Sequence, residues 1–130
     1  MTRVLLVKHS LPEIVETVPA REWTLSSEGQ RRAQMLAKEL IAFQPEAIVS
    51  SLELKARQTA EIIAEECRLT TQTVEGLHEH DRSHVPYLAK GEFQTLVKEF
   101  FSKPDSLVFG SETAMRALDR FETTVESFIH

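Results

Sequence analysis

The chain has 130 residues, of which 42% are hydrophobic and 27% charged, and this balance is that of one soluble globular domain rather than of a disordered or fibrous chain. Its 20 acidic and 15 basic residues give a formal net charge of −5, which argues against a protein that binds nucleic acid through phosphate contacts. No apolar run approaches membrane-spanning length and no leader pattern is present, so we expect a cytoplasmic protein without a membrane or nucleic-acid partner.

The first predicted element is a strand at residues 4–7, a continuous apolar run that is typical of a strand buried on both faces. It is followed by Lys8, His9 and Ser10, and in open α/β sheets ligands bind beyond the carboxyl ends of such strands. Lys8 and His9 are therefore candidate functional residues, although a histidine after a strand is more often structural. The loop that follows, 11–23, contains two prolines and is expected to form one wall of a pocket.

The first helix is predicted over residues 27–43, where apolar residues recur at helical spacing. Ser26 or Ser27 is its expected N-cap, and Gln30 stands in the capping-box position relative to Ser27. Pro45 ends the pattern, since proline cannot continue a helix.

A strand at 47–51, a helix at 54–67 and a short strand at 71–74 are expected next. This alternation of strands and helices predicts an α/β fold with parallel strands and right-handed crossovers. The single cysteine, Cys67, lies on the apolar stripe of its helix, which favours a buried, inert thiol.

The C-terminal half begins with a polar loop at 76–84 that is crowded with titratable side chains. A helix around 93–100 is closed by Pro104, and Gly110 with Ser111 introduces a long amphipathic helix that must cover a sheet or another helix. No strand pattern follows that helix, so we expect the architecture to be incomplete at its C-terminal end.

Four side chains with complementary chemistry are expected to meet at one edge of the sheet. Lys8 and His9 follow the first strand, Lys55 follows the second and Glu79 follows the third. The carboxyl ends of parallel strands lie together, so loops that are distant in sequence can bring these groups to one place. Two cations, an imidazole and a carboxylic acid suit phosphate-ester chemistry.

The same segments resemble the motifs of the histidine phosphatase superfamily, also called the phosphoglycerate-mutase-like family. Lys8-His9-Ser10 is similar to its Arg-His-Gly, and residues 50–60 are similar to its Ser-Ser-Pro-Leu-x-Arg-Ala-x-Gln-Thr-Ala signature. Leu77-His78-Glu79 resembles the segment that bears the family's proton donor. Residues 25–29 and 110–112 resemble its Leu-Thr-x-x-Gly and Gly-Glu-Ser helix starts, so the likeness covers nearly the whole chain in the right order.

The resemblance implies a three-layer sandwich with a mostly parallel sheet flanked by helices, and a phosphatase mechanism without cofactor or metal. His9 would attack phosphorus and form a phosphohistidine, and Glu79 would protonate the leaving oxygen. Lys8 and Lys55 take positions where the family has phosphate-binding arginines, so they keep the charge but lose the two-pronged fork. The expected partner is a small phosphorylated substrate or inorganic phosphate.

A second departure from the family is larger. The family places another histidine in a Ser-His-Gly-like turn after a further strand, and His130 has neither that strand before it nor a glycine after it. The sequence therefore resembles roughly the N-terminal two-thirds of the fold. We expect lowered activity and self-association through an exposed sheet edge.

Three alternatives remain open at this stage. His78, Glu79, His80, Asp81 and His84 could form a metal site, because imidazoles and carboxylates are common metal ligands. The chain could be a pseudo-enzyme that binds phosphate without turnover, or it could transfer the phosphoryl group as a mutase does. Hydrolysis of a small phosphomonoester is the favoured activity.

Overall fold

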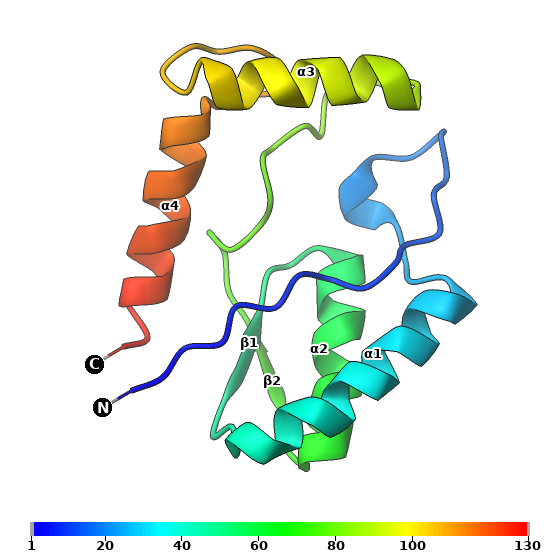
Figure 1. Ribbon diagram of the computed structural model, residues 1–130, viewed down its shortest axis with the longest axis vertical. Coiled ribbons are helices and arrows are strands. Elements are labelled where there is room, and N and C mark those ends of the chain that lie inside the picture. Colours follow the sequence, from blue (N-terminus) through cyan, green and yellow to red (C-terminus); the bar gives the residue numbers. More distant parts are fainter. Residues whose placement is uncertain (1, 130) are drawn as a thin grey trace. The chain divides into compact units, whose positions relative to one another are not determined.

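The computed structural model describes residues 2–129 and has the mixed α/β character expected from the sequence (Figure 1). Its elements are, in chain order, the 3-10 helix η1 (Ala20–Glu22), α1 (Ser27–Leu40), the 3-10 helix η2 (Ile41–Phe43), β1 (Ile48–Ser50), α2 (Leu54–Cys67), β2 (Thr71–Thr73), α3 (Lys90–Ser102) and α4 (Ala114–Glu126). The chain divides into two compact units, one containing Arg21–Glu75 with the residues up to Ile14, the other containing Val15–Ala20 with the residues from Gly76 onward. A single domain over the whole chain stays a prediction.

In the first unit, α1 begins one residue earlier than a capping box would require. Ser26 is the N-cap, and its Oγ accepts a hydrogen bond from the Gly29 amide at 3.0 Å. The third helical residue is therefore Gly29, which has no side chain to complete a box, and the predicted pairing of Ser27 with Gln30 is wrong. The predicted extent of the helix is confirmed, with its last turn tightened into η2.

The helices α1 and α2 pack against each other and form the core of the first unit (Figure 1). Small side chains at the contact allow the two helix backbones to approach closely. The buried apolar residues are Ala33 and Ala37 on α1 and Ala60, Ile63 and Ala64 on α2. Cys67 is only half-buried, contrary to prediction, because it is the last residue of α2, where the chain turns at Arg68 with a φ of 58°.

The strands β1 and β2 form a parallel pair, as predicted for the second and third strands. Ile48 pairs with Thr71 and Ser50 with Thr73, and the Val74 amide donates to the Ser50 carbonyl at 2.9 Å beyond the ladder. The helix α2 connects the two strands, which is the crossover that a parallel pair requires.

The segment at residues 4–7 is not a strand, so this prediction is wrong. The sheet described by the structure contains β1 and β2 alone, and residues 4–7 belong to no ladder within residues 2–129. All four side chains are exposed, Leu6 to 70%. An apolar run becomes a buried strand only when a neighbouring strand accepts and donates its backbone hydrogen bonds, and here none of the described strands does so.

The second unit contains α3, α4 and the loop that runs from Gly76 to α3. An aromatic cluster holds this loop to α3: the ring centroid of His80 lies 4.2 Å from that of Phe100 and 4.9 Å from that of Phe109. The helix α4 follows Gly110 and Ser111 as predicted, with Thr113 as its N-cap, and the Thr113 hydroxyl accepts from the Arg116 amide at 3.1 Å. None of the helices among residues 2–129 has both the length and the apolar composition to cross a membrane.

Candidate active site

The imidazole of His9 is oriented by its own turn. Its Nδ1 lies 2.7 Å from the carbonyl oxygen of Ser10, and a carbonyl can only accept, so Nδ1 carries the hydrogen and donates. This hydrogen bond assigns the tautomer of the neutral ring and puts the nucleophilic lone pair on Nε2. The His9 side chain is half-buried.

Ser10 fastens this turn to both helices of the first unit. Its amide donates to the Thr59 Oγ1 at 3.0 Å, and its hydroxyl donates to the Gly29 carbonyl at 2.6 Å. The Thr59 hydroxyl in turn donates to the Lys55 carbonyl at 2.8 Å. The structure thus joins the His9 turn to the first turn of α2, where Lys55 lies, through a buried threonine.

The loop after His9 is also drawn close to α1. The Leu11 carbonyl accepts from the Ser26 amide at 3.0 Å and from the Ser26 hydroxyl at 3.1 Å. A Cβ at Gly29 would overlap the Leu11 carbonyl oxygen, so this approach requires glycine. The glycine that the sequence marked as part of a helix start therefore also serves the site.

Lys55 is almost completely buried, with 2% of the residue exposed. Its Nζ lies 3.8 Å from Glu53 Oε2 and 5.6 Å from the centroid of the Trp23 ring. A carboxylate and an aromatic face both stabilise an ammonium group that has left water. Trp23 was not identified as a site residue from the sequence; its position in the predicted wall loop was the available signal.

The other two candidate residues are Lys8 and Glu79. Lys8 is exposed at the end of the segment 4–7. Glu79 belongs to the second unit, where its Oε1 accepts a hydrogen bond from Arg82 at 3.1 Å and its side chain is 36% exposed. The Arg82 guanidinium also lies over the Phe93 ring, 4.8 Å from the centroid, so the partner of Glu79 is itself held in place.

The backbone around Glu79 is held by Arg120 from α4, a residue that the sequence analysis missed. Arg120 Nη1 donates to the carbonyls of Gly76 at 2.8 Å and His78 at 2.7 Å, and Nη2 lies 3.4 Å from the Glu79 carbonyl. Arg120 also forms a two-pronged ion pair with Glu112, with donor–acceptor distances of 2.6 and 3.2 Å. The loop carbonyls that Arg120 binds lie 41 to 44 residues away and are backbone atoms, so no local pattern marks them.

Three ionisable groups near this loop have shifted pKa values. The Ser83 amide and hydroxyl lower the pKa of Asp81 to about 2. Burial alone would raise the pKa of Glu112, but hydrogen bonds from Arg120 and the Asp81 amide outweigh it, so the net shift is downward. Burial among aromatic rings lowers the pKa of His80, because it disfavours the charged ring.

The alternative of a metal site finds no support in this loop. Within residues 2–129, no three or more His, Cys, Asp or Glu side chains are grouped so that they could hold a metal ion. Asp81 accepts from the Ser83 hydroxyl at 2.8 Å, and His80 Nε2 lies 3.1 Å from the Glu112 carbonyl. These side chains therefore serve the packing of the loop.

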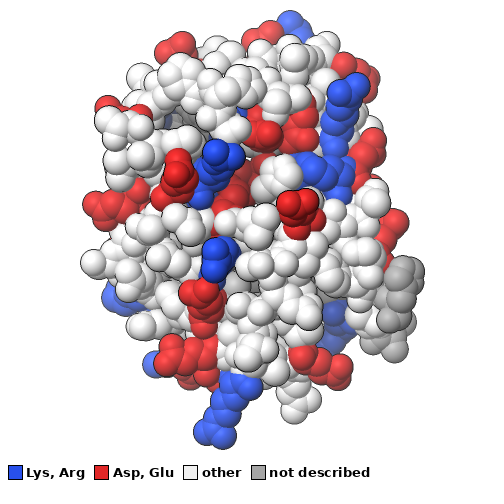
Figure 2. Space-filling view, turned by 180° about the vertical axis from the view of Figure 1, so that it is seen from behind, with Lys and Arg blue, Asp and Glu red and all other residues white. Residues whose placement is uncertain are grey.

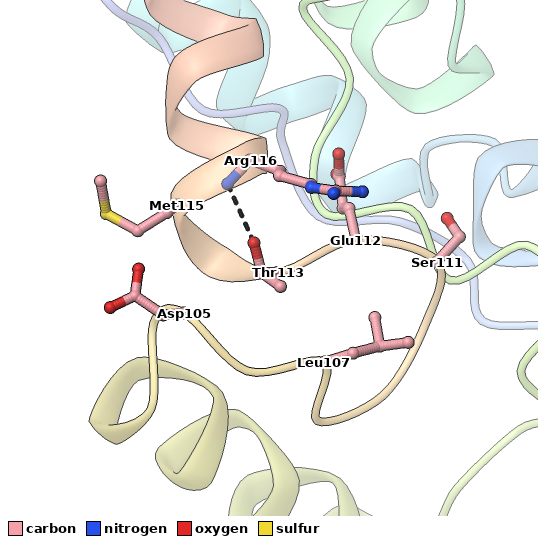
Figure 3. Close-up of a pocket in the computed structure, with 7 residues that line it drawn as sticks. All are labelled: Asp105, Leu107, Ser111, Glu112, Thr113, Met115 and Arg116. Atoms are coloured by element: carbon pink, nitrogen blue, oxygen red, sulfur yellow. Dashed lines mark hydrogen bonds between the residues drawn. The ribbon is translucent and has the colours of Figure 1, made fainter.

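A pocket of about 440 Å³ lies at the start of α4 in the second unit (Figure 3). It is lined by Asp105, Leu107, Ser111, Glu112, Thr113, Met115 and Arg116. None of the four predicted site residues lines it, and its Thr113 hydroxyl is occupied in capping the helix. The pocket is therefore not the expected phosphate site.

Several solved structures share the fold of this chain. The native structure of mycobacterial glucosyl-3-phosphoglycerate phosphatase has a TM-score of 0.76 and 20% identity over 92% of this chain and 59% of its own. A structure described as mycobacterial hydrolase 2 has a TM-score of 0.74 and 20% identity, covering 92% of this chain and 54% of its own. A complex of the same glucosyl-3-phosphoglycerate phosphatase with inorganic phosphate has a TM-score of 0.72 and 20% identity over 93% and 59%.

The chain thus spans between 54% and 59% of the length of these structures, and at such identities the likeness shows the fold. None of the curated proteins matches the sequence. The model of the histidine phosphatase superfamily (branch 1), in contrast, matches residues 4–130. Because this match covers nearly every residue, the chain belongs to the histidine phosphatase superfamily.

Proposed function

We propose that this protein hydrolyses small phosphomonoesters through a phosphohistidine on His9. The observation that carries the proposal is the 2.7 Å hydrogen bond from His9 Nδ1 to the Ser10 carbonyl, because it leaves Nε2 as the nucleophilic nitrogen. The Nε2 lone pair forms a bond to phosphorus as the ester P–O bond breaks, and Glu79 gives its proton to the leaving oxygen. Water then attacks phosphorus and gives a proton to the Glu79 carboxylate as the N–P bond breaks, so inorganic phosphate is released and both His9 and Glu79 return to their starting states.

The proposed role of Lys55 is to bind the phosphoryl group of the substrate. An ammonium group in a dry environment stabilises developing negative charge more strongly than one in water. Lys8 supplies a second, solvent-exposed cation. Neither lysine offers the planar fork of arginine, so we expect weaker orientation of the substrate than an arginine pair would give.

The proposed ligand is a small phosphate compound. On the face shown in Figure 2, acidic and basic side chains are interspersed, which suits a small anion better than a polyanion. One structural relative is a complex with inorganic phosphate, which supports the same chemistry here. We further propose reduced activity of this chain, because lysines stand where the family pattern has phosphate-binding arginines, and a cytoplasmic location. His130 lies outside the described residues.

A pseudo-enzyme that binds phosphate without turnover is the second candidate. It is favoured by the Glu53 carboxylate, which lies 3.8 Å from Lys55 and competes with a bound anion for the ammonium group. Transfer of the phosphoryl group to a second substrate, as in a mutase, differs only in the acceptor that replaces water.

Turnover of p-nitrophenyl phosphate tests the proposal. We expect His9→Ala to lower turnover by at least about 100-fold, the order of loss seen when a catalytic group is removed. His84→Ala, a change at an exposed histidine, should leave turnover unchanged. Acid-labile, base-stable phosphate on the wild type that is absent from His9→Ala would identify the intermediate.

The outcomes separate the candidates. Turnover that survives in His9→Ala would refute the phosphohistidine. Binding of inorganic phosphate in calorimetry by a chain without turnover would select the pseudo-enzyme.

A further inference from the structure

We infer that Arg120 and Glu112 are positioning residues that fix the backbone of the loop 76–81 and thereby aim the Glu79 carboxyl. This inference rests on the proposed role of Glu79 as proton donor. It is carried by the ion pair between Arg120 and Glu112 and by the backbone groups that both side chains bind within the second unit.

Arg120 binds the loop from the side of its carbonyl groups. Its guanidinium reaches the carbonyls of Gly76, His78 and Glu79 while it also pairs with Glu112. A guanidinium has five N–H donors in a fixed plane, so a single side chain can hold several acceptors in one arrangement. Three of the four carbonyls from Gly76 to Glu79 are thereby tied to one point on α4.

Glu112 binds the same loop just after Glu79. Its Oε1 accepts from the Asp81 amide at 3.1 Å and from Arg120 at 2.6 Å. The Arg120 and Glu112 side chains are only 21% and 14% exposed, so water and salt screen this pair weakly. The backbone is therefore held on both sides of Glu79, at carbonyls up to Glu79 and at the amide of Asp81.

The shape of the loop start fits the same contact. Gly76 has a φ of 100°, and a Cβ there would overlap the Thr124 hydroxyl. Thr124 lies one turn after Arg120 on α4, and its hydroxyl donates to the Arg120 carbonyl at 2.8 Å. Glycine lets the loop lie against this part of α4 at the distance that the Arg120 hydrogen bonds require.

A general acid must stand within hydrogen-bond reach of the oxygen that it protonates. Loss of the pair would leave the Glu79 carboxyl in the molecule but would displace it. The damage should therefore depend on how much the leaving group needs a proton. Alkyl phosphates need one, whereas p-nitrophenolate leaves without it.

The first test compares kcat/KM for an alkyl phosphomonoester with kcat/KM for p-nitrophenyl phosphate, since this ratio reports on the step that forms phosphohistidine. In Arg120→Gln and Glu112→Gln we expect a fall of about 100-fold for the alkyl substrate, the order that a misplaced catalytic group costs, and little change for p-nitrophenyl phosphate. Arg120→Lys keeps the charge without the fork, so its kcat/KM for the alkyl substrate should lie between the values of the wild type and of Arg120→Gln. Arg116→Gln, at an exposed arginine of the same helix, should match the wild type.

The second test measures hydrogen exchange at the amides of residues 77–81 and needs no turnover. We expect exchange to be at least about 10-fold faster in Arg120→Gln, Arg120→Lys and Glu112→Gln, and unchanged in Arg116→Gln, because the loop backbone opens more often once its carbonyls or the Asp81 amide lose their side-chain partners. Unchanged exchange would overturn the inference whatever the activity. Equal losses on both substrates would also overturn it, because they indicate general destabilisation. Failure of the proposed function is seen separately, as turnover that does not depend on His9.

Discussion

At the residue scale, two glycines on helices of this protein stand in opposite environments. Gly29 on α1 is buried against the Leu11 carbonyl, close to the His9 turn. A Cβ at Gly91 on α3 would meet no atom within 4 Å apart from its chain neighbours and the backbone of its own helix. The same substitution therefore meets a clash at one site and open space at the other.

We predict opposite signs for Gly29→Ala and Gly91→Ala. Gly29→Ala should lower the free energy of unfolding by about 1–3 kcal/mol, the usual cost of overpacking. Gly91→Ala should raise it by roughly 0.5–1 kcal/mol, since alanine loses less conformational entropy in a helix. Urea denaturation of both variants gives the comparison, and a destabilised Gly91→Ala or a neutral Gly29→Ala would contradict it.

At the scale of elements, His80 ties the loop that bears Glu79 to α3. Its ring lies against Phe100 and Phe109, and its Nε2 lies 3.1 Å from the Glu112 carbonyl. The folded protein favours the neutral ring, because burial and the nearby Arg82 charge lower the pKa of His80, although Glu112 opposes the shift.

This shift makes stability depend on pH. With the folded pKa below the ordinary 6.5, the unfolded chain binds the proton more readily. The stabilisation of the fold by the neutral His80 ring is complete above pH 6.5, and it is lost as the pH falls through the pKa of His80 in the folded protein. His80→Phe keeps a stacked ring without a titrating group, so its melting temperature should fall less than that of the wild type between pH 7.5 and 5.5. If the melting temperatures of the two proteins fell equally over this pH range, this explanation would be wrong.

The elements also show what the sequence could and could not predict. The bounds of α2 and the positions of β1 and β2 followed from local patterns, because the period and composition of a segment belong to that segment alone. The parallel pairing of β1 with β2 followed from the helix between them, since a parallel pair needs such a crossover. The strand at 4–7 failed because pairing is a property of two segments. Arg120 was missed for a related reason: its ligands are backbone carbonyls, which every sequence contains.

The candidate site, like the fold, was predicted from the sequence only in part. His9 and Lys55 were found from their places after two apolar runs, and the structure links their turns through Ser10 and Thr59. The contact of Lys55 with Trp23 could not be read from the sequence, because it joins two residues of different segments and depends on how the chain around Trp23 lies against the start of α2.

At the scale of the whole molecule, we expect the exposed apolar surface at residues 4–7 to promote self-association. Extended apolar segments with unpaired backbone groups are common sites of pairing between chains. Leu6, with 70% exposure, is the most exposed of the four side chains.

We predict that Leu6→Lys shifts the protein toward monomer in sedimentation velocity, because a charge at this position opposes burial against a second chain. Leu107→Lys, at a leucine that is 63% exposed in the second unit, controls for a general gain in solubility. A wild type that is monomeric at all concentrations, or equal effects of the two variants, would argue against association through this segment.

The hydroxyl of Thr59 accepts from the Ser10 amide and donates to the Lys55 carbonyl at the same time. The direction of these two hydrogen bonds cannot be reversed, since an amide only donates and a carbonyl only accepts. Valine would match its shape but would break both links, whereas serine would keep them. A ligand that moved the first turn of α2 would therefore also move the His9 turn. Lys55 and His9 would shift together when the ligand binds.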